Sequence, residues 1–589
     1  MAKPILSVSG LDASFRSGNL WVPVVRNLSF EIAPGSTLAM VGGSGSGKSV
    51  TALAIMRLLP EGSARVSGQV SFAGRSLLDL AEREMCALRG NEIAMIFQEP
   101  MTSLNPTARV GFQIGEVLRR HRGMSAAEAR AESVRLLDRV RIPAAASRVH
   151  DYPHLMSGGM RQRVMIAMAL ACHPKLMIAD EPTTALDVTV QAQIIDLMRT
   201  LQQEEGLSML FITHDFGVVA EIADDIVVMH QGQAVERGPA PKIFSEPKHP
   251  YTRMLLAAVP RTGLIASGDF RAETGEPASA AASAEPILRV RNLTKSFDVR
   301  RGAWGRVSAR IHAIDGISFD IRAGETLSLV GESGCGKSTT GRCVIGLTRP
   351  SSGSIELNGK DLLQDGSEAA RQNRRRMQMV FQDPYASLNP RMYISDSIAE
   401  PLLVEGRASR AEIAARVDNL LEAVGLSPAM RNRFPHEFSG GQRQRICIAR
   451  ALSVHPDLLI ADEAVSALDV SIKAQIIDLL LDLQKKMGLA FLFISHDMAV
   501  VERISHRVAV MYMGEIVEMG SRSSVLGNPQ HPYTKLLLSA IPVPDPVRRT
   551  ERPKLAHREL VSPLRSLDHQ QRRLAYRSVG PDHLVQEWE

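Results

Sequence analysis

The sequence has few residues that could form a covalent scaffold, a metal centre or a membrane span. It contains five cysteines in 589 residues, at positions 86, 172, 335, 343 and 447, and none of them form a C-x-x-C pair. This spacing indicates neither a disulfide framework nor a zinc or iron–sulfur site. The longest uncharged apolar run considered, Val164–Cys172, is too short to cross a bilayer, so no transmembrane helix is predicted.

The chain also lacks strong signals for secretion and for nucleic-acid binding. The N-terminus, MAKPILSVSG, has no apolar core of a secretory signal, which favours a cytosolic location. The net charge is +6, weakly basic for this length, and a solvated surface of mixed charge explains it better than a nucleic-acid interface does. Aromatic residues make up only 4%, but 44% of residues are hydrophobic, enough for ordinary buried cores.

One motif occurs twice and matches the phosphate-binding loop G-x-x-x-x-G-K-[ST]. The first copy is Gly42, Gly43, Ser44, Gly45, Ser46, Gly47, Lys48 and Ser49. The second copy is Gly331, Glu332, Ser333, Gly334, Cys335, Gly336, Lys337 and Ser338. Each copy follows a short apolar run and precedes a predicted helix, which is the context that confirms the motif.

The chemistry of this loop requires these residue types. Glycines let successive backbone N–H groups face the β- and γ-phosphates, and the helix N-terminus that follows favours negative charge. Lys48 and Lys337 are predicted to contact the phosphates. Ser49 and Ser338 are predicted to place a hydroxyl on Mg2+.

The order of features repeats along the chain, which sets the domain organisation. Asp180 and Asp462 are 282 residues apart, and so are His214 and His496. We expect a first domain over 1–262, a flexible linker rich in Ala, Ser, Gly and Glu over 263–286, a second domain over 287–546 and a basic tail over 547–589. The tail is rich in arginine and shows no clear period. Strand-like and helical segments alternate in each half, so we expect an α/β fold with a largely parallel core sheet, and an additional antiparallel sheet near each N-terminus.

A glutamine follows an apolar strand in each half. Gln98 follows Ile96 and Phe97, and Gln382 follows Val380 and Phe381. A glutamine in this place can reach Mg2+ or the attacking water. We therefore predict both catalytic and metal-ligand roles for Gln98 and Gln382.

A second glycine loop opens a helix in each half. Its residues are Ser157, Gly158 and Gly159, and Ser439, Gly440 and Gly441. The serine can cap the helix while backbone N–H groups point outward, which suits a phosphate. One nucleotide does not need two such loops from one domain, so this loop is expected to serve the nucleotide held by the other half.

Two acids end the next apolar run in each half, Asp180-Glu181 and Asp462-Glu463. The first acid suits Mg2+ ligation, and the second can polarise water for in-line attack. Paired acids are common on solvated strand ends, and it is their position after the two loops that favours catalysis. His214 and His496 end a later core strand and could contact the γ-phosphate.

The partner of the adenine ring is less defined by the sequence. Phe15 and Phe297 precede the phosphate loops and could stack on adenine, or could equally be strand residues that face a core. Trp21 and Trp304 are the competing candidates.

The ordered set of motifs resembles that of the ATP-binding-cassette ATPases. The resemblance implies two P-loop NTPase domains in tandem, each with a parallel core sheet, an antiparallel β subdomain and a helical subdomain that carries the Ser-Gly-Gly signature. It also implies ATP and Mg2+ as cofactors, and a head-to-tail sandwich in which Ser439 closes ATP at Lys48 and Ser157 closes ATP at Lys337.

A narrower resemblance is to the oligopeptide, dipeptide and nickel importers. It rests on Phe97–Pro106 and Phe381–Pro390, and on the repeated His-Pro-Tyr-Thr at His249–Thr252 and His531–Thr534. This branch implies ATP-driven import of glutathione or a short peptide at the cytoplasmic face of a bacterial inner membrane, with two permease subunits and a periplasmic binding protein as partners. Segments Gln98–Val117 and Gln382–Ile398 would dock the permease.

Several alternatives remain open at this point. A tandem cassette that acts on ribosomes would usually carry a long charged helical linker, which is absent, and would lack His-Pro-Tyr-Thr; export is a further alternative. Met160 stands where the signature usually has Gln, and both sites keep Glu and His, so both are expected to be competent. Cys335 lies beside Lys337 at a helix N-terminus, so its thiol is expected to have a lowered pKa.

Overall fold

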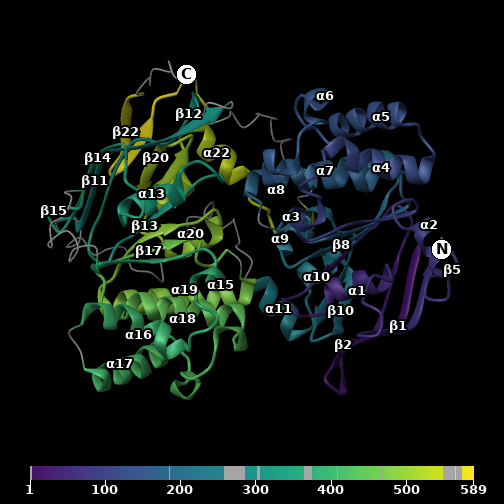
Figure 1. The fold of residues 1–589 in the computed structure, drawn as a ribbon, viewed down its shortest axis with the longest axis horizontal. Coiled ribbons are helices and arrows are strands. Elements are labelled where there is room, and N and C mark those ends of the chain that lie inside the picture. The colour runs from purple at the N-terminus through teal and green to yellow at the C-terminus, as the bar shows by residue number, and fades with distance from the viewer. Residues whose placement is uncertain are drawn as a thin grey trace.

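The computed structural model describes residues 3–184, 186–257, 285–301, 306–363, 375–406, 409–466, 468–547, 564–565 and 574–588. They form two halves that lie side by side, the first running from purple through blue to teal and the second from teal through green to yellow (Figure 1). Each half has a mostly parallel sheet, an antiparallel sheet and surrounding helices, which confirms the predicted α/β class. Most of the predicted linker lies outside the described residues.

The core sheet of the first half has six strands in the order β10-β9-β3-β8-β7-β6. Its strands are β3 (Thr37–Val41), β6 (Ile93–Ile96), β7 (Leu176–Asp180), β8 (Ser208–Thr213), β9 (Asp225–His230) and β10 (Gln233–Pro239). Neighbouring strands are parallel except for β10, which is antiparallel to β9. Parallel order brings the carboxyl ends of β3, β6, β7 and β8 to one edge, where ligands bind in such sheets.

The strands of this sheet read as continuous apolar runs because both faces are covered. Every residue of β3, β7 and β8 is buried. Ile178 packs into the core beneath the antiparallel sheet, whereas its neighbours Met177 and Ala179 pack into the core beneath the helices. Parallel strands with two buried faces lose the alternation of polar and apolar residues seen in one-sided sheets.

The antiparallel sheet of the first half has the order β2-β1-β4-β5. Its strands are β1 (Leu6–Ser17), β2 (Leu20–Ile32), β4 (Ala64–Phe72) and β5 (Arg75–Ser76). The helices of this half are α1 (Lys48–Ile55), α2 (Glu82–Leu88), α3 (Pro100–Ser103), α4 (Val110–Arg122), α5 (Ala126–Arg139), α6 (Ala145–Arg148), α7 (Gly158–Leu170), α8 (Val188–Glu205), α9 (Phe216–Ile222), α10 (Ala240–Ser245) and α11 (Pro250–Ala257). The additional sheet near the N-terminus is therefore confirmed.

The second half repeats this plan with a larger core sheet of order β16-β17-β18-β13-β19-β20-β23-β22. Its strands are β13 (Thr326–Val330), β16 (Met377–Val380), β17 (Leu458–Asp462), β18 (Ala490–Ile494), β19 (Arg507–Tyr512), β20 (Glu515–Ser521), β22 (Tyr576–Gly580) and β23 (His583–Gln586). The last two strands belong to the arginine-rich tail, and no periodicity in the sequence pointed to them. They form a hairpin that extends the sheet beyond β20.

The second antiparallel sheet has the order β15-β14-β11-β12-β21. Its strands are β11 (Leu288–Arg301), β12 (Arg306–Ile321), β14 (Ser352–Leu357), β15 (Lys360–Asp361) and β21 (Leu564–Arg565). The helices of this half are α13 (Lys337–Val344), α15 (Pro384–Ser387), α16 (Ile394–Glu405), α17 (Arg410–Ala423), α18 (Gly440–Leu452), α19 (Val470–Met487), α20 (Met498–Ile504), α21 (Arg522–Gly527) and α22 (Pro532–Ser539).

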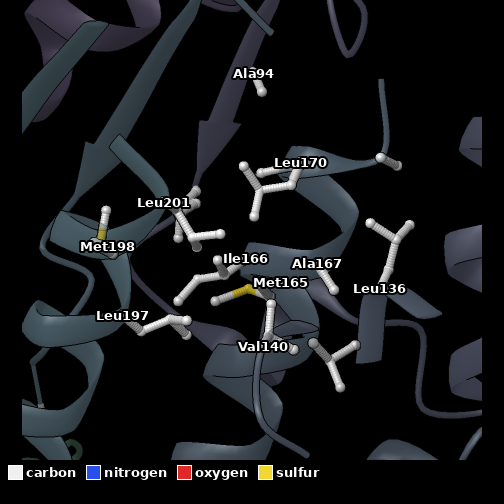
Figure 2. Close-up of a cluster of buried hydrophobic side chains, with 14 of the residues drawn as sticks. Ala94, Leu136, Val140, Met165, Ile166, Ala167, Leu170, Leu197, Met198 and Leu201 are labelled. Carbon is white, nitrogen blue, oxygen red and sulfur yellow. The ribbon is translucent and has the colours of Figure 1, made fainter. Parts of the chain in front are cut away.

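A buried cluster joins the helical subdomain of the first half to its core sheet. Leu136 of α5, Ile166 of α7 and Leu201 of α8 contribute to it, and Figure 2 shows these side chains converging around α7. Because α7 is apolar on nearly all sides, it lies in the middle of this cluster. The packing fixes the direction in which the N-terminus of α7, with its Ser-Gly-Gly loop, faces.

The two halves meet through helices that follow their catalytic motifs. Helix α11 of the first half packs against α19 of the second, and α22 of the second packs against α8 of the first (Figure 1). The contact is reciprocal, because the last described helix of the first half and of the second half each pack on the opposite half. In the part of the chain that the structure describes, no helix combines the length and apolarity needed to cross a membrane.

Candidate nucleotide sites

The first phosphate loop lies between β3 and α1, and its geometry requires glycine. Gly45 and Gly47 have φ of 72° and 97°, in the left-handed region that favours glycine. A Cβ on Gly42 would lie 2.2 Å from the carbonyl oxygen of Met229. Lys48 is buried, and its Nζ donates to the Gly42 and Gly43 carbonyl oxygens at 2.8 and 3.0 Å. The lysine is therefore held inside the loop, although burial lowers its pKa.

The second loop, between β13 and α13, has nearly the same geometry. Lys337 Nζ donates to the carbonyl oxygens of Gly331 and Glu332 at 2.7 and 2.8 Å. A Cβ on Gly331 would lie 2.2 Å from the Met511 carbonyl oxygen. Both predicted loops thus form a cradle of backbone N–H groups at a helix N-terminus, the arrangement that binds phosphate.

The predicted metal ligands lie together in each half. Ser49 Oγ donates to Asp180 Oδ1 at 3.0 Å, and Ser338 Oγ donates to Asp462 Oδ1 at 2.7 Å. Burial raises the pKa of Asp180 to about 6 and also raises the pKa of Asp462. Hydroxyl, carboxylate and the nearby glutamine amide supply oxygen ligands only, which is the donor set that Mg2+ takes.

The predicted base of the first half, Glu181, is surrounded by hydrogen-bond donors. Gln98 Nε2 and Thr184 Oγ1 donate to Glu181 Oε2 at 3.0 and 2.8 Å, and His214 Nδ1 lies 3.3 Å from Oε1. Burial alone would raise the pKa of Glu181, but the hydrogen bond and charge of His214 outweigh it and lower the pKa to about 2. Glu181 is therefore a carboxylate at neutral pH.

The second half repeats this set with one difference. Gln382 Nε2 donates to Glu463 Oε2 at 2.8 Å, and His496 Nδ1 lies 3.4 Å from Oε1. Although burial raises the pKa of Glu463, His496 lowers it below its ordinary value. Ser466, the counterpart of Thr184, donates to the backbone carbonyl of Glu463 at 2.8 Å.

The signature serines cap their own helices. Ser157 Oγ accepts from Met160 N at 3.3 Å, and Ser439 Oγ accepts from Gln442 N at 3.3 Å. Both serines are exposed. Within the described residues no hydrogen bond joins either serine to Lys48 or Lys337, so their pairing with the opposite nucleotide stays a prediction.

Hydrogen bonds between the two halves come from residues just after the predicted base Glu181. Asp187 Oδ1 accepts from Ser333 N at 2.7 Å, and Thr189 hydrogen-bonds to the buried Glu332 carboxyl group. The first half thus contacts the phosphate loop of the second half directly. Lys48 in turn lies within the field of Asp469 from the second half.

Comparison with known proteins identifies the family. Residues 25–184 and 314–466 match the family described as ABC transporter. The chain belongs to the ABC transporter family. In this ABC transporter chain, residues 235–284 and 517–564 match the C-terminal region of oligopeptide/dipeptide transporters. The predicted branch and the predicted ATP-hydrolysing activity are confirmed.

Curated relatives extend over nearly the whole ABC transporter chain. The glutathione import ATP-binding protein GsiA of Salmonella paratyphi A is 52% identical over 99% of this chain and 97% of its own length. The protein of the same name from Escherichia coli K12 is 53% identical over 99% of this chain and 96% of its own length. The solved structure of cbiO1 from Clostridium perfringens, part of an ABC transporter complex, is 30% identical over 41% of this chain and 92% of its own, with a TM-score of 0.36.

The expectation for the thiol of Cys335 in this ABC transporter ATPase is wrong. Cys335 is 7% exposed, and burial raises its pKa, although Lys337 acts in the opposite direction. Lys337 Nζ lies 3.8 Å from Sγ but donates its shorter bonds to backbone carbonyl groups. Sequence proximity to a lysine and a helix N-terminus did not reveal that the side chain points into the protein.

The aromatic candidates for adenine differ in their surroundings. Phe15 is half-buried on β1, paired with Val22 of β2, whereas Phe297 is 44% exposed with Lys295 Nζ 5.0 Å from its ring centre. The ring of Trp21 is already covered by Arg65 at 4.0 Å. Trp304 lies outside the described residues. The role of Phe15 and Phe297 in stacking stays a prediction.

Two site residues were not predicted from the sequence. Tyr251 and Tyr533 accept hydrogen bonds from backbone N–H groups of the phosphate loops, those of Gly43 and Glu332, each at 3.0 Å. Both tyrosines belong to His-Pro-Tyr-Thr, which served in the sequence only as a mark of the importer branch. Its repetition at equal spacing in both halves was the available signal for a role at the site.

Proposed function

We propose that this ABC transporter ATPase hydrolyses ATP to energise the import of glutathione or another short peptide through separate permease subunits. The observation that carries the proposal is the 52–53% identity, over 99% of the chain, with relatives named glutathione import ATP-binding proteins. Two permeases and a periplasmic binding protein would complete the transporter. The chain would work at the cytoplasmic face of a bacterial inner membrane.

Hydrolysis in the first half would use the residues around Lys48. Lys48 and the loop N–H groups would hold the β- and γ-phosphates, and Ser49, Asp180 and Gln98 would hold Mg2+. When bound, Mg2+ would neutralise charge on the phosphates and favour the ionised form of Asp180. The second half would use Lys337, Ser338, Asp462 and Gln382 in the same way.

The base is the best-supported assignment within the site. Glu181, already ionised and oriented by Gln98 and His214, would accept a proton from water aligned with the γ-phosphate. His214 would then lie beside the γ-phosphate and keep the Glu181 carboxylate in place. Glu463 and His496 would have these roles in the second half.

Closure of the sites would join the two halves. The contact of Asp187 with the Ser333 N–H supports a sandwich in which Ser439, Gly440 and Gly441 cover ATP at Lys48. Ser157, Gly158 and Gly159 would cover ATP at Lys337. With Lys337→Ala to empty the second site, an ATP analogue with a photo-reactive γ-phosphate should label the peptide that contains Ser439. Labelling of the Ser157 peptide instead would refute this pairing.

Exposed apolar side chains near the catalytic glutamines suit a docked permease. Phe112 and Tyr385, in the segments Gln98–Val117 and Gln382–Ile398, are 61% and 65% exposed. Single exposed apolar side chains are common on proteins, so the support is that both halves expose one within the segment that the resemblance to the importer branch assigns to docking. We infer that these segments bind cytoplasmic helices of the permease.

Reconstitution with the permeases tests the import function. Proteoliposomes should contain this chain and the permeases encoded by neighbouring genes, with ATP inside and the binding protein outside. They should accumulate labelled glutathione. Uptake should stop with Glu181→Gln plus Glu463→Gln. Uptake of dipeptides or tripeptides but not glutathione would assign a different solute, and no uptake of either class with active ATPase would overturn the proposal.

A further inference from the structure

The tyrosine of each His-Pro-Tyr-Thr motif lies between its own phosphate loop and the opposite half. Tyr533 Oη accepts from Glu332 N, the second residue of the loop, and Tyr533 is 7% exposed. Its ring packs on Tyr512 with 4.3 Å between ring centres. Burial raises the pKa of Tyr533, so its oxygen stays a neutral hydroxyl in the cell. The side chain of Tyr533 thereby connects helix α22 to the second phosphate loop.

A short chain of hydrogen bonds holds this tyrosine. Tyr533 N donates to His531 Nδ1 at 3.1 Å. The carboxylate of Glu518 on β20 accepts from the backbone N–H groups of Gln530 and His531 at 2.8 and 2.9 Å. Hydrogen bonds of Glu518, His531 and Tyr533 therefore connect strand β20 to the start of α22, and α22 to the phosphate loop.

The first half contains the same chain. Glu236 accepts from Lys248 N and His249 N at 2.8 and 3.0 Å, and Tyr251 N donates to His249 Nδ1 at 3.2 Å. Tyr251 Oη then accepts from Gly43 N. Repetition in both halves indicates that the arrangement belongs to the site and is not an accident of packing.

Only the second half adds the C-terminal hairpin to this chain. Strand β23 pairs with β20 at Glu518 and Met519, and His583 Nε2 lies 2.8 Å from Glu518 Oε1. Glu518 is 0% exposed, whereas its counterpart Glu236 is only half-buried. Trp588 also packs edge-on against His531, with 5.3 Å between ring centres. Among the described residues of the first half, β10 is an edge strand without such a cover.

We propose that Tyr533 is a positioning residue of the second phosphate loop, and that the C-terminal hairpin holds it in place through Glu518 and His531. A buried N–H that loses its acceptor must find another partner or pay the full cost of desolvation, so the loop would shift. The hairpin would then tune ATP binding at Lys337 and leave the site at Lys48 unaffected. Tyr251 would position the first loop without this support.

Cys335 provides a direct readout of the loop that does not depend on hydrolysis. It lies inside the second loop and is buried, so its rate of modification by N-ethylmaleimide reports how often the loop opens. Tyr533→Phe removes only the accepting oxygen, and His583→Leu removes the nitrogen that contacts Glu518 at similar size. Each change should raise the labelling rate of Cys335 by about 2–10-fold, the range expected for loss of one hydrogen bond.

Controls within the same chain separate a local effect from unfolding. Cys447, buried in α18, should keep its slow labelling rate in both variants. Tyr251→Phe, the matched change in the first half, should leave Cys335 unchanged. Unchanged Cys335 labelling in Tyr533→Phe, or an equal rise at Cys447, would overturn the proposal.

Nucleotide affinity provides the second test. In a Lys48→Ala background, His583→Leu and Tyr533→Phe should each raise the dissociation constant of ATP at the second site by about 2–10-fold. In the His583 variant the KM for ATP should rise with it while kcat at saturating ATP stays near its starting value, because His583 lies outside the site and Glu463 and its partners are untouched. In a Lys337→Ala background, His583→Leu should not change ATP affinity. A loss of affinity at both sites would assign the hairpin to overall stability and refute the proposal.

Discussion

The two halves contain the same motif residues on frameworks that differ in how much surrounds each site. The first phosphate loop has Gly43 where the second has Glu332, whose carboxyl group contacts Thr189 from the opposite half. The second loop is also linked to the C-terminal hairpin, and the described part of the first half has no equivalent. The predicted nucleotide-binding residues are thus alike in the two halves, whereas the residues that support them differ. The second site is the more enclosed of the two.

The largest effects should come from the bases and should be equal in the two halves. Glu181→Gln and Glu463→Gln should each lower hydrolysis at their own site by about 10²–10⁴-fold, since general-base catalysis is lost while size and hydrogen bonding are kept. ATP binding should persist, and the double variant should remain closed around ATP. Single-turnover hydrolysis with one lysine replaced measures each site separately. Rapid turnover in the double variant would contradict the assignment.

Substitutions in the proposed permease-docking segments should give the next largest effect on ATP hydrolysis. Phe112→Ser should weaken binding to the permease by about 5–30-fold, as loss of a central apolar contact does. ATP hydrolysis stimulated by the permease and solute should fall accordingly, whereas basal hydrolysis should be kept. Leu20→Ser, which alters an equally exposed side chain on β2 (74% exposed), is the control. Equal loss of basal and stimulated hydrolysis would argue against docking at Phe112.

An ion pair present in one half alone should give a smaller, pH-dependent effect. Lys473 Nζ lies 2.6 Å from Asp497, whereas the counterpart pair is Gln191 and Asp215, 3.5 Å apart. Although burial raises the pKa of Asp497, Lys473 lowers it overall. A carboxyl group whose pKa is lower in the folded state stabilises the fold at pH values above its unfolded pKa of 3.8. This stabilisation is lost as the pH falls through the pKa of the folded state.

Lys473→Gln should therefore convert the second half to the pattern of the first. At pH 7 it should lower the local free energy of unfolding by about 1–2 kcal/mol, with most of that difference gone once Asp497 is protonated. Hydrogen–deuterium exchange of α19 peptides at several pH values measures this. If the exchange difference between Lys473→Gln and the parent chain does not shrink in acid, the aliphatic part of Lys473 stabilises the fold by packing and not through the ion pair with Asp497.

The smallest effect concerns the signature loop. Gln442 Oε1 accepts from Ser439 N at 3.0 Å and completes a capping box at the start of α18, whereas Met160 offers no such acceptor for α7. Met160→Gln should stabilise the start of α7 by about 0.5–1 kcal/mol. Slower amide exchange at Met160 to Arg163 would reveal it. Gln442→Met should speed amide exchange at the start of α18. If neither variant changes amide exchange, the capping box does not distinguish the two halves.

Features that follow from the order of residues along the chain could be predicted from the sequence. Features that depend on where a side chain points, or on pairing with a distant strand, could not. The loops around Lys48 and Lys337, the contact of Ser49 with Asp180, and the α/β class follow from motifs placed after buried strands. The thiol of Cys335 was misjudged because burial, which no spacing reveals, outweighs a nearby lysine. Strands β22 and β23 were missed because short, polar segments gain their structure by pairing with β20.

The backbone of Glu181 carries a consequence for which substitutions can occur there. Its φ is 47°, and that of Glu463 is 48°, a left-handed conformation that costs most side chains energy and that glycine and asparagine tolerate. Two demands therefore conflict at this position: the proposed role as a base needs a carboxylate, but the backbone conformation favours other residue types. Random mutation should yield Gly or Asn at this position in stable but hydrolytically silent chains, and Val or Ile only in chains that are also poorly folded.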